Sequence, residues 1–188
     1  MSWIDMIKDY TPCDNQEKSD KEVIIKYSKI LNDMLFRDNE IIHMTSSAFI
    51  VNKAKDKVLM IHHNIYNSWA WTGGHADGEE DLLLVASNEA REETGIKNII
   101  PITKEIVSID ILPVFGHVKR GKYISAHLHA SVAFLFQADE NEILTVKPDE
   151  NSGVKWIPIN EIDLYSSEPH MKVVYEKIVF KLKNQLFI

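Results

Sequence analysis

Acidic side chains crowd one short stretch of the chain. Between residues 73 and 95 there are seven carboxylates and a single Arg or Lys. Like charges at this density destabilise one another unless a cation joins them. On a helix, Glu89, Glu92 and Glu93 stand three and four residues apart and project to one face. Because Mg²⁺ and Mn²⁺ prefer oxygen ligands and Mg²⁺ bridges to substrate phosphates, this spacing predicts a divalent-metal site suited to phosphate chemistry.

Glycines frame the acidic stretch and strengthen this interpretation. The pair Gly73-Gly74 precedes it, and Gly95 stands where a helix of roughly 79–94 would end. An acidic helix face by itself is most often a solvated surface that binds nothing. The double glycine upstream and the glycine cap downstream favour the metal site over the solvated face.

The segment Gly74–Ile96 resembles the Nudix box, G-x5-E-x7-R-E-U-x-E-E-x-G-U, in which U is a bulky aliphatic residue. Ala90 occupies the first U position, and Asn88 stands where the family has arginine. A looser resemblance extends over roughly 43–160. Because asparagine lacks the charge and the bidentate donors of arginine, we expect a somewhat looser metal site. The residues that match the box are Gly74, Glu80, Glu89, Glu92, Glu93, Gly95 and Ile96.

The resemblance implies a Nudix-type α/β/α sandwich with a mixed sheet. It also implies a hydrolase that uses Mg²⁺ or Mn²⁺ to cleave a phosphoanhydride bond, in a nucleoside diphosphate linked to another group. By position, Glu89, Glu92 and Glu93 are the implied catalytic and metal-binding residues, and a carbonyl of the Gly73-Gly74 turn, assigned to Gly74, is a further ligand. Which glutamate acts as the base stays open. The alternative is a non-catalytic module on the same fold that senses a nucleotide or metabolite.

Residues outside the box are weaker candidates. Glu150 is either an additional metal-binding acid, as in many similar proteins, or a solvated turn carboxylate. Trp71 is a candidate to stack on a base, and His75 is the histidine nearest the box. Arg120 lies in a basic turn that a substrate phosphate could reach.

Two further histidines, His127 and His129, alternate along a predicted strand and so share one face. Such a pair can bind a metal or contact a phosphate, although a hydrogen-bonded pair on a sheet face is the commoner case.

The elements that must position these residues follow from periodicity. Residues 1–40 are expected to form an N-terminal helical extension whose helix starts at Ser19-Asp20, and residues 41–188 the Nudix domain. The segment 69–74 is expected to be a loop. Strands are predicted at 43–52, 57–63, within 99–111, at 123–137 and at 153–158, and a last helix at 168–186.

Composition limits the function classes. The chain has 188 residues, 21 basic and 28 acidic side chains and a net charge of −7. This acidic balance argues against a nucleic-acid polymer as partner and leaves a small-molecule phosphoanhydride substrate. One cysteine, Cys13, together with the lack of a signal-peptide pattern or membrane span, predicts a cytoplasmic protein with no membrane partner. Dimers are common among similar proteins, so a homodimer is one candidate assembly, and the oligomeric state stays open.

Overall fold

The computed structural model describes residues 2–119 and 121–186. The strands are β1 (Ile42–Asn52), β2 (Lys57–His63), β3 (Ser68–Ala70), β4 (Thr72–His75), β5 (Ile99–Pro101), β6 (Ser108–Val114), β7 (His117–Lys119), β8 (Lys122–Ile124), β9 (His127–Ala138) and β10 (Asn151–Pro158). The helices are α1 (Trp3–Asp9), α2 (Asn15–Tyr27), α3 (Leu82–Thr94), the short 3₁₀ turn η1 (Ile159–Glu161), α4 (Ile162–Tyr165) and α5 (Pro169–Asn184).

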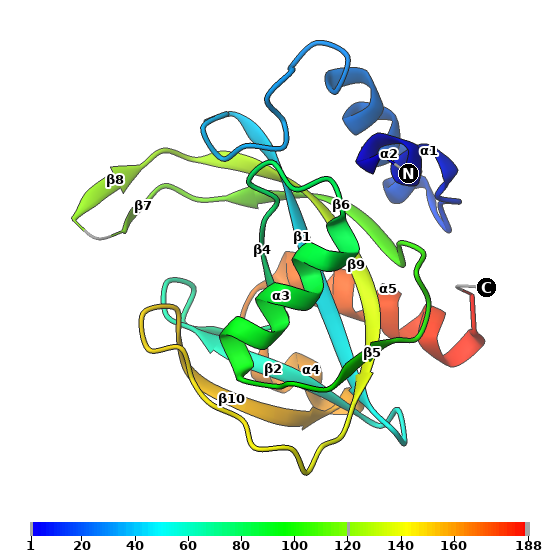
Figure 1. Cartoon of the computed structure of the whole chain (residues 1–188), viewed down its shortest axis with the longest axis vertical. Helices are drawn as coiled ribbons and strands as arrows, with labels where there is room; N and C mark the ends of the chain where they lie inside the picture. Colours follow the sequence, from blue (N-terminus) through cyan, green and yellow to red (C-terminus); the bar gives the residue numbers. More distant parts are fainter. Residues whose placement is uncertain (1, 120, 187–188) are drawn as a thin grey trace.

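The centre of the molecule is a mixed sheet with the strand order β10-β2-β1-β9-β5. Strand β3 pairs with β2, β4 with β1, and β6 with β9, while β7 and β8 form a separate hairpin. The pair β1–β9 is parallel and the remaining pairs are antiparallel. Helix α3 crosses one face of this sheet and α5 covers the other (Figure 1). The α/β/α sandwich with a mixed sheet, expected from the sequence, is therefore confirmed.

Alternation along β1 explains why the sheet carries a layer on each face. Met44 and Ile50 pack into the cluster that contains residues of α3, whereas Phe49 and Val51 pack into the cluster that contains residues of α5. Successive side chains of a strand point to opposite faces, so a central strand buried on both sides is apolar at odd and even positions alike.

The segment that positions the box glycines is a pair of short strands. We expected a loop over 69–74, but β3 pairs with β2, and β4 pairs with β1 with Gly74 opposite Ser46. The long strand expected over 123–137 is two strands, β8 and β9, and the region 99–111 likewise contains parts of β5 and β6. Helix α3 begins at Leu82, because the Asp81 side chain caps it by accepting a hydrogen bond from the Leu84 N–H.

The N-terminal helix starts earlier than its sequence pattern predicts. Asp14, rather than Ser19-Asp20, caps α2, and its carboxylate accepts the Glu17 N–H at 2.8 Å. Asp20 instead accepts the backbone N–H of Ile111 on β6 at 2.8 Å, and Gln16 donates to the Ile109 carbonyl at 3.3 Å. Side chains of α2 therefore pair with backbone groups of β6 that β9 leaves available.

A buried ion cluster joins α2 to α5. The Nζ of Lys181 lies 2.5 Å from Oε1 of Glu17, and Lys177 bridges Glu17 and Asp110 at 3.2 and 2.6 Å. Glu17 has no exposed surface. Burial acts to raise the pKa of Glu17, but the Cys13 N–H and the lysine ammonium groups outweigh burial and lower that pKa to about 2.

Within residues 2–119 and 121–186, every helix is too short or too polar to cross a bilayer.

Candidate active site

A cleft of about 730 Å³ opens where the box helix meets the sheet. Helix α3 contributes Glu89 and Glu93, β4 contributes the two glycines and His75, and the loop before β10 contributes Glu150. The far wall is formed by the β7–β8 hairpin, which extends away from the sheet (Figure 1). Residues from separate parts of the chain therefore surround one space.

Glu93 is the most buried carboxylate of the cleft, with 4% of its surface exposed. Its Oε2 accepts the backbone N–H of Gly73 at 3.0 Å, which fixes the carboxylate between α3 and β4. Burial, together with the charges of Glu89 and Glu150, raises the pKa of Glu93 to about 8 against the opposing effect of the Gly73 N–H. A buried carboxylate with acidic neighbours is a site that a cation would stabilise.

Glu89 lies one helical turn before Glu93 and faces Gly74. A Cβ atom at position 74 would overlap the Glu89 carboxylate, so the absence of a side chain there makes room for that group. Burial, followed by the charges of Glu92 and Glu150, raises the pKa of Glu89.

Glu92 is placed differently from the other two helix glutamates. Its side chain is exposed, and its Oε2 lies 3.3 Å from the Nζ of Lys147. The same ammonium group is 3.1 Å from Oε2 of Glu150. Glu89, Glu93 and Glu150 thus converge on the cleft, while Glu92 lies at its rim. The box residues Glu80 and Asn88 are both exposed.

The residues predicted to contact a substrate differ in whether they are found in the cleft. Trp71 lines the cleft, and its ring meets Tyr175 edge to face at 5.6 Å while its backbone N–H donates to the Tyr175 hydroxyl. His75 also lines the cleft. Arg120 lies outside the described residues. Residues His127 and His129 both face the cleft as well.

The sequence reasoning missed three residues of the cleft and its rim: His43, Arg37 and Lys147. On β1 the odd positions run His43, Thr45, Ser47 before they become apolar, and these polar side chains form part of the cleft wall. That alternation is visible in the sequence, but its meaning depends on the parallel pairing with β9.

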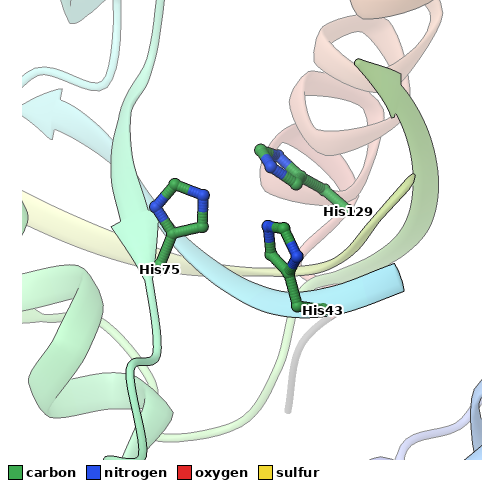
Figure 2. A group of neighbouring side chains, drawn as sticks. All are labelled: His43, His75 and His129. Carbon is green, nitrogen blue, oxygen red and sulfur yellow. The ribbon is translucent and has the colours of Figure 1, made fainter. Parts of the chain in front are cut away.

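The histidines of the cleft form a cluster. His43, His75 and His129 place ring nitrogens within 4.8 Å of one another, and their three rings point toward a common space (Figure 2). Burial, followed by the neighbouring rings of His75 and His43, lowers the pKa of His129 to about 2. Burial also lowers the pKa of His43.

The fold and this glutamate-lined cleft define a hydrolase of the α/β/α sandwich class that carries the Nudix box. The chain belongs to the Nudix family, because a family model described as NUDIX domain matches residues 42–178. The RNA pyrophosphohydrolase of Pelagibacter ubique (strain HTCC1062) is 31% identical over 134 residues, which is 66% of this chain and 84% of that protein. Both findings confirm the resemblance and identify a Nudix-type pyrophosphohydrolase.

Solved structures agree on the fold. A MutT protein from Methanosarcina mazei Go1 superposes with a TM-score of 0.57 at 17% identity, covering 77% of this chain and 98% of that one. An Ap4A hydrolase from C. elegans gives a TM-score of 0.53 at 17% identity, covering 75% and 98%. At this level of identity the likeness establishes the shared architecture.

Proposed function

We propose that this protein hydrolyses a phosphoanhydride bond in a nucleoside diphosphate linked to another group, with Mg²⁺ or Mn²⁺ as cofactor. The observation that carries the proposal is the convergence of three carboxylates from two distant segments on a single cleft. Glu89 and Glu93 come from α3 and Glu150 from the loop before β10. The exposed Glu92 and the carbonyl of Gly74 complete the proposed ligand set.

The donor set fits a hard divalent cation. All proposed ligands are oxygens, which Mg²⁺ and Mn²⁺ prefer. The raised pKa values of Glu89 and Glu93 arise from burial and from neighbouring negative charge, and a cation among these groups would offset both effects. When bound, such an ion would neutralise phosphate charge and acidify a bound water.

The protein groups have distinct roles in this proposal. The Gly73 N–H holds the Glu93 carboxylate in one orientation. Because Gly74 has no side chain, the Glu89 carboxylate has room beside the backbone at that position. Lys147 contacts Glu150, which lines the cleft. A carboxylate of this set that is not engaged as a ligand accepts the proton of the attacking water.

The size of the cleft suits a nucleotide. A volume of about 730 Å³ falls within the range of about 300–1,000 Å³ typical of small-molecule sites. We propose that Trp71 and His75 contact the substrate, and that Arg120 supplies a charge for a phosphate. Trp71 presents an aromatic surface whose packing on Tyr175 limits its rotation.

The test is a substrate panel. Nucleotide sugars, dinucleoside polyphosphates, coenzyme A, nucleoside triphosphates and non-nucleotide pyrophosphates would each be incubated with Mg²⁺, Mn²⁺ or a chelator, and phosphate release measured. We expect turnover of a nucleoside diphosphate derivative that the chelator abolishes, and a loss of at least about 100-fold in kcat in Glu93→Gln. Equal turnover with the chelator would contradict the proposal.

Two further measurements distinguish the proposed activity from cleavage of RNA and from a non-catalytic sensing function. The relative named RNA pyrophosphohydrolase makes an RNA with a 5′-triphosphate the necessary comparison, and preferential cleavage of that RNA would overturn our expectation of a small-molecule substrate. Tight binding of a nucleotide without turnover would favour the non-catalytic sensing module.

We also propose a cytoplasmic location and a homodimer. The cytoplasmic assignment is supported by Cys13, an exposed free thiol, which suits a reducing compartment. Light scattering on the purified protein tests the dimer, and a monomeric mass at micromolar concentration would refute it.

A further inference from the structure

Three adjacent strands bring histidines together on one wall of the cleft. In the parallel pair β1–β9, His43 lies opposite His129, and on the other side of β1, His75 of β4 lies opposite Thr45. His43 and Thr45 share a face because they are two residues apart. The ring centroids are 4.9 Å apart for His43–His75, 5.0 Å for His43–His129 and 5.1 Å for His75–His129.

We propose that His43, His75 and His129 form a second metal site, which takes a divalent transition metal of the Zn²⁺ class and is distinct from the carboxylate site. One nitrogen from each ring lies within 4.8 Å of the others. A tetrahedral zinc ion holds its nitrogen ligands about 3.4 Å apart. The three rings already face one another (Figure 2), so metal binding would require only rotation about their side-chain bonds to close this difference.

A hydrogen bond orients the ring of His43 for this role. Nδ1 of His43 lies 2.8 Å from the carbonyl oxygen of Asn39, so Nδ1–H donates and Nε2 keeps its lone pair. A histidine that binds a metal through one nitrogen commonly donates the other to a backbone carbonyl in this way. The orientation of the His43 ring is therefore set by the turn that precedes β1, before any ion binds.

Two of the ring nitrogens are buried without a hydrogen-bond partner among the described residues. They are Nε2 of His43 and Nε2 of His129. A buried polar atom left unsatisfied costs about 1–3 kcal/mol, and such atoms call for a ligand or another role. A metal ion among the three rings would satisfy both atoms at once.

The donor chemistry separates this site from the carboxylate site. Imidazole nitrogen suits Zn²⁺, Fe²⁺ or Ni²⁺, whereas the glutamate oxygens suit Mg²⁺ and Mn²⁺. Three protein ligands leave a fourth position open, as in catalytic zinc sites. Since all three histidines line the cleft, that position would face the cleft. A phosphate oxygen or a water is the ligand it would take.

A phosphate held directly by protonated histidines is the competing explanation. Repulsion among three imidazolium rings about 5 Å apart in a partly buried wall disfavours their protonation and so favours the neutral rings. Neutral rings are the form that binds a metal. The ring of His127 lies 4.9 Å from that of His43, but His127 is not among the three residues whose nitrogens lie within 4.8 Å of one another.

This inference does not rest on the proposed hydrolase activity, and its test uses the metal alone. Metal-free protein would be titrated with Co²⁺ and, separately, Zn²⁺. We expect one ion per chain that gives the intense visible absorption of four-coordinate Co²⁺. X-ray absorption of the Zn²⁺ form should show imidazole scattering. The double variant Glu89→Gln, Glu93→Gln should keep both signatures, which separates this site from the carboxylates.

The variant His75→Asn should weaken Zn²⁺ binding by more than about 100-fold, because loss of a ligand costs at least as much as loss of an outer-shell partner. His117→Asn is the matched control, since His117 lines the same cleft but lies outside the cluster, and its Nδ1 lies 2.9 Å from the Phe115 carbonyl oxygen; it should bind as the wild type does. Circular dichroism would confirm folding, and the X-ray absorption result on unaltered protein does not depend on any variant. Oxygen-only scattering, or a signature lost in the double glutamine variant, would overturn the proposal.

Discussion

The Nζ atom of Lys147 lies 3.3 Å from Oε2 of Glu92, across the rim of the cleft. The Nudix box places an arginine at the position of Asn88, which is exposed here. The positive charge beside the carboxylates therefore comes from the loop before β10. That loop also carries Glu150, which the same lysine contacts.

Replacement of Lys147 should make the fold more dependent on metal. In Lys147→Met the carboxylates lose one of their counter-charges, so we expect the metal-free protein to lose about 1 kcal/mol or less, because Glu92 is exposed and Lys147 is only partly buried. Saturating Mg²⁺ should recover this loss. Calorimetry with and without Mg²⁺ would show a larger rise in Tm for the variant, and an equal rise in both proteins would contradict the assignment.

Restoring the family arginine should tighten the site. In Asn88→Arg a guanidinium can pair with two carboxylates in bidentate fashion. We expect a several-fold gain in Mg²⁺ affinity by titration calorimetry. Asn88→Gln lengthens the side chain without charge and should leave the affinity unchanged. If arginine brings no gain, Asn88 is not the cause of a looser site.

The two box glycines should fail in different ways. At Gly73 a Cβ would meet the Ser46 carbonyl oxygen at 2.9 Å, so Gly73→Ala must shift backbone and should cost about 1–3 kcal/mol of stability. At Gly74 the obstacle is the flexible carboxylate of Glu89. Gly74→Ala should therefore keep most of its stability but lose activity. Urea denaturation and kcat, measured on both variants, check this contrast; equal losses of stability would refute it.

Metal binding should release a proton. The pKa of Glu93 is raised to about 8, so this group carries a proton near neutral pH in the metal-free protein. A cation that binds Glu93 must displace that proton. Calorimetric titration in buffers of different ionisation enthalpy should show about one proton released per Mg²⁺ near pH 7 and none well above pH 8. In Glu93→Gln this release should vanish, and a release that persists would point to another group.

The buried ion cluster should make stability depend on pH. The folded-state pKa of Glu17 is lowered from 4.5 to about 2, so its contribution is complete above about pH 4.5 and lost as the pH falls toward 2. Glu17→Gln leaves Lys181 and Lys177 without their partner and should cost about 3–5 kcal/mol near neutral pH.

This deficit should shrink over the same acidic range, because the wild-type group becomes protonated there. Denaturation curves at a series of pH values measure it. The exposed pair Lys8–Asp5 gives the control, and Asp5→Asn should change little. A deficit independent of pH would exclude the ionised Glu17.

Local sequence signals predicted much of this architecture. Gly95 adopts the left-handed conformation, with φ of 71°, where the helix was expected to end. The strand boundaries at 43–52 and 57–63 were nearly right, because the apolar runs 48–51 and 58–61 and the polar turn between them mark them. The start of α2 was missed because two capping candidates compete, and Asp20 is instead engaged by the β6 backbone. Such an interaction between distant segments leaves no local signature.

Only the part of the site that depends on local spacing in the sequence was predictable. Glu89 and Glu93 follow from the helix period, and their cleft position agrees with that expectation. By its spacing Glu92 shares the helix face with these two residues, but it lies at the rim of the cleft. There it contacts Lys147, which is 55 residues away in the sequence. The histidine cluster depends on the register between β1 and β9, and register is a property of the folded sheet.

The division of the chain at residues 40 and 41 stays a prediction. The family match begins at residue 42, in agreement with that boundary. Yet Ile7 and Ile24 are fully buried in the same cluster as Leu82 and Ala86 of α3. We propose that residues 1–40 form an extension that depends on the sheet for its core.

The polar wall of the cleft and part of the hydrophobic cluster that contains residues of α5 occupy a single face of the same two strands. Along β1 that face runs from His43 to Val51, and along β9 from His129 to Leu135. A slip of one residue in either strand would turn its histidine to the opposite layer and bring a large apolar side chain, or a methyl group, into the active cleft. Apolar contacts at one end of these strands thus set the alignment of the polar side chains at the other end. Substitutions in the core would therefore change the geometry of the cleft.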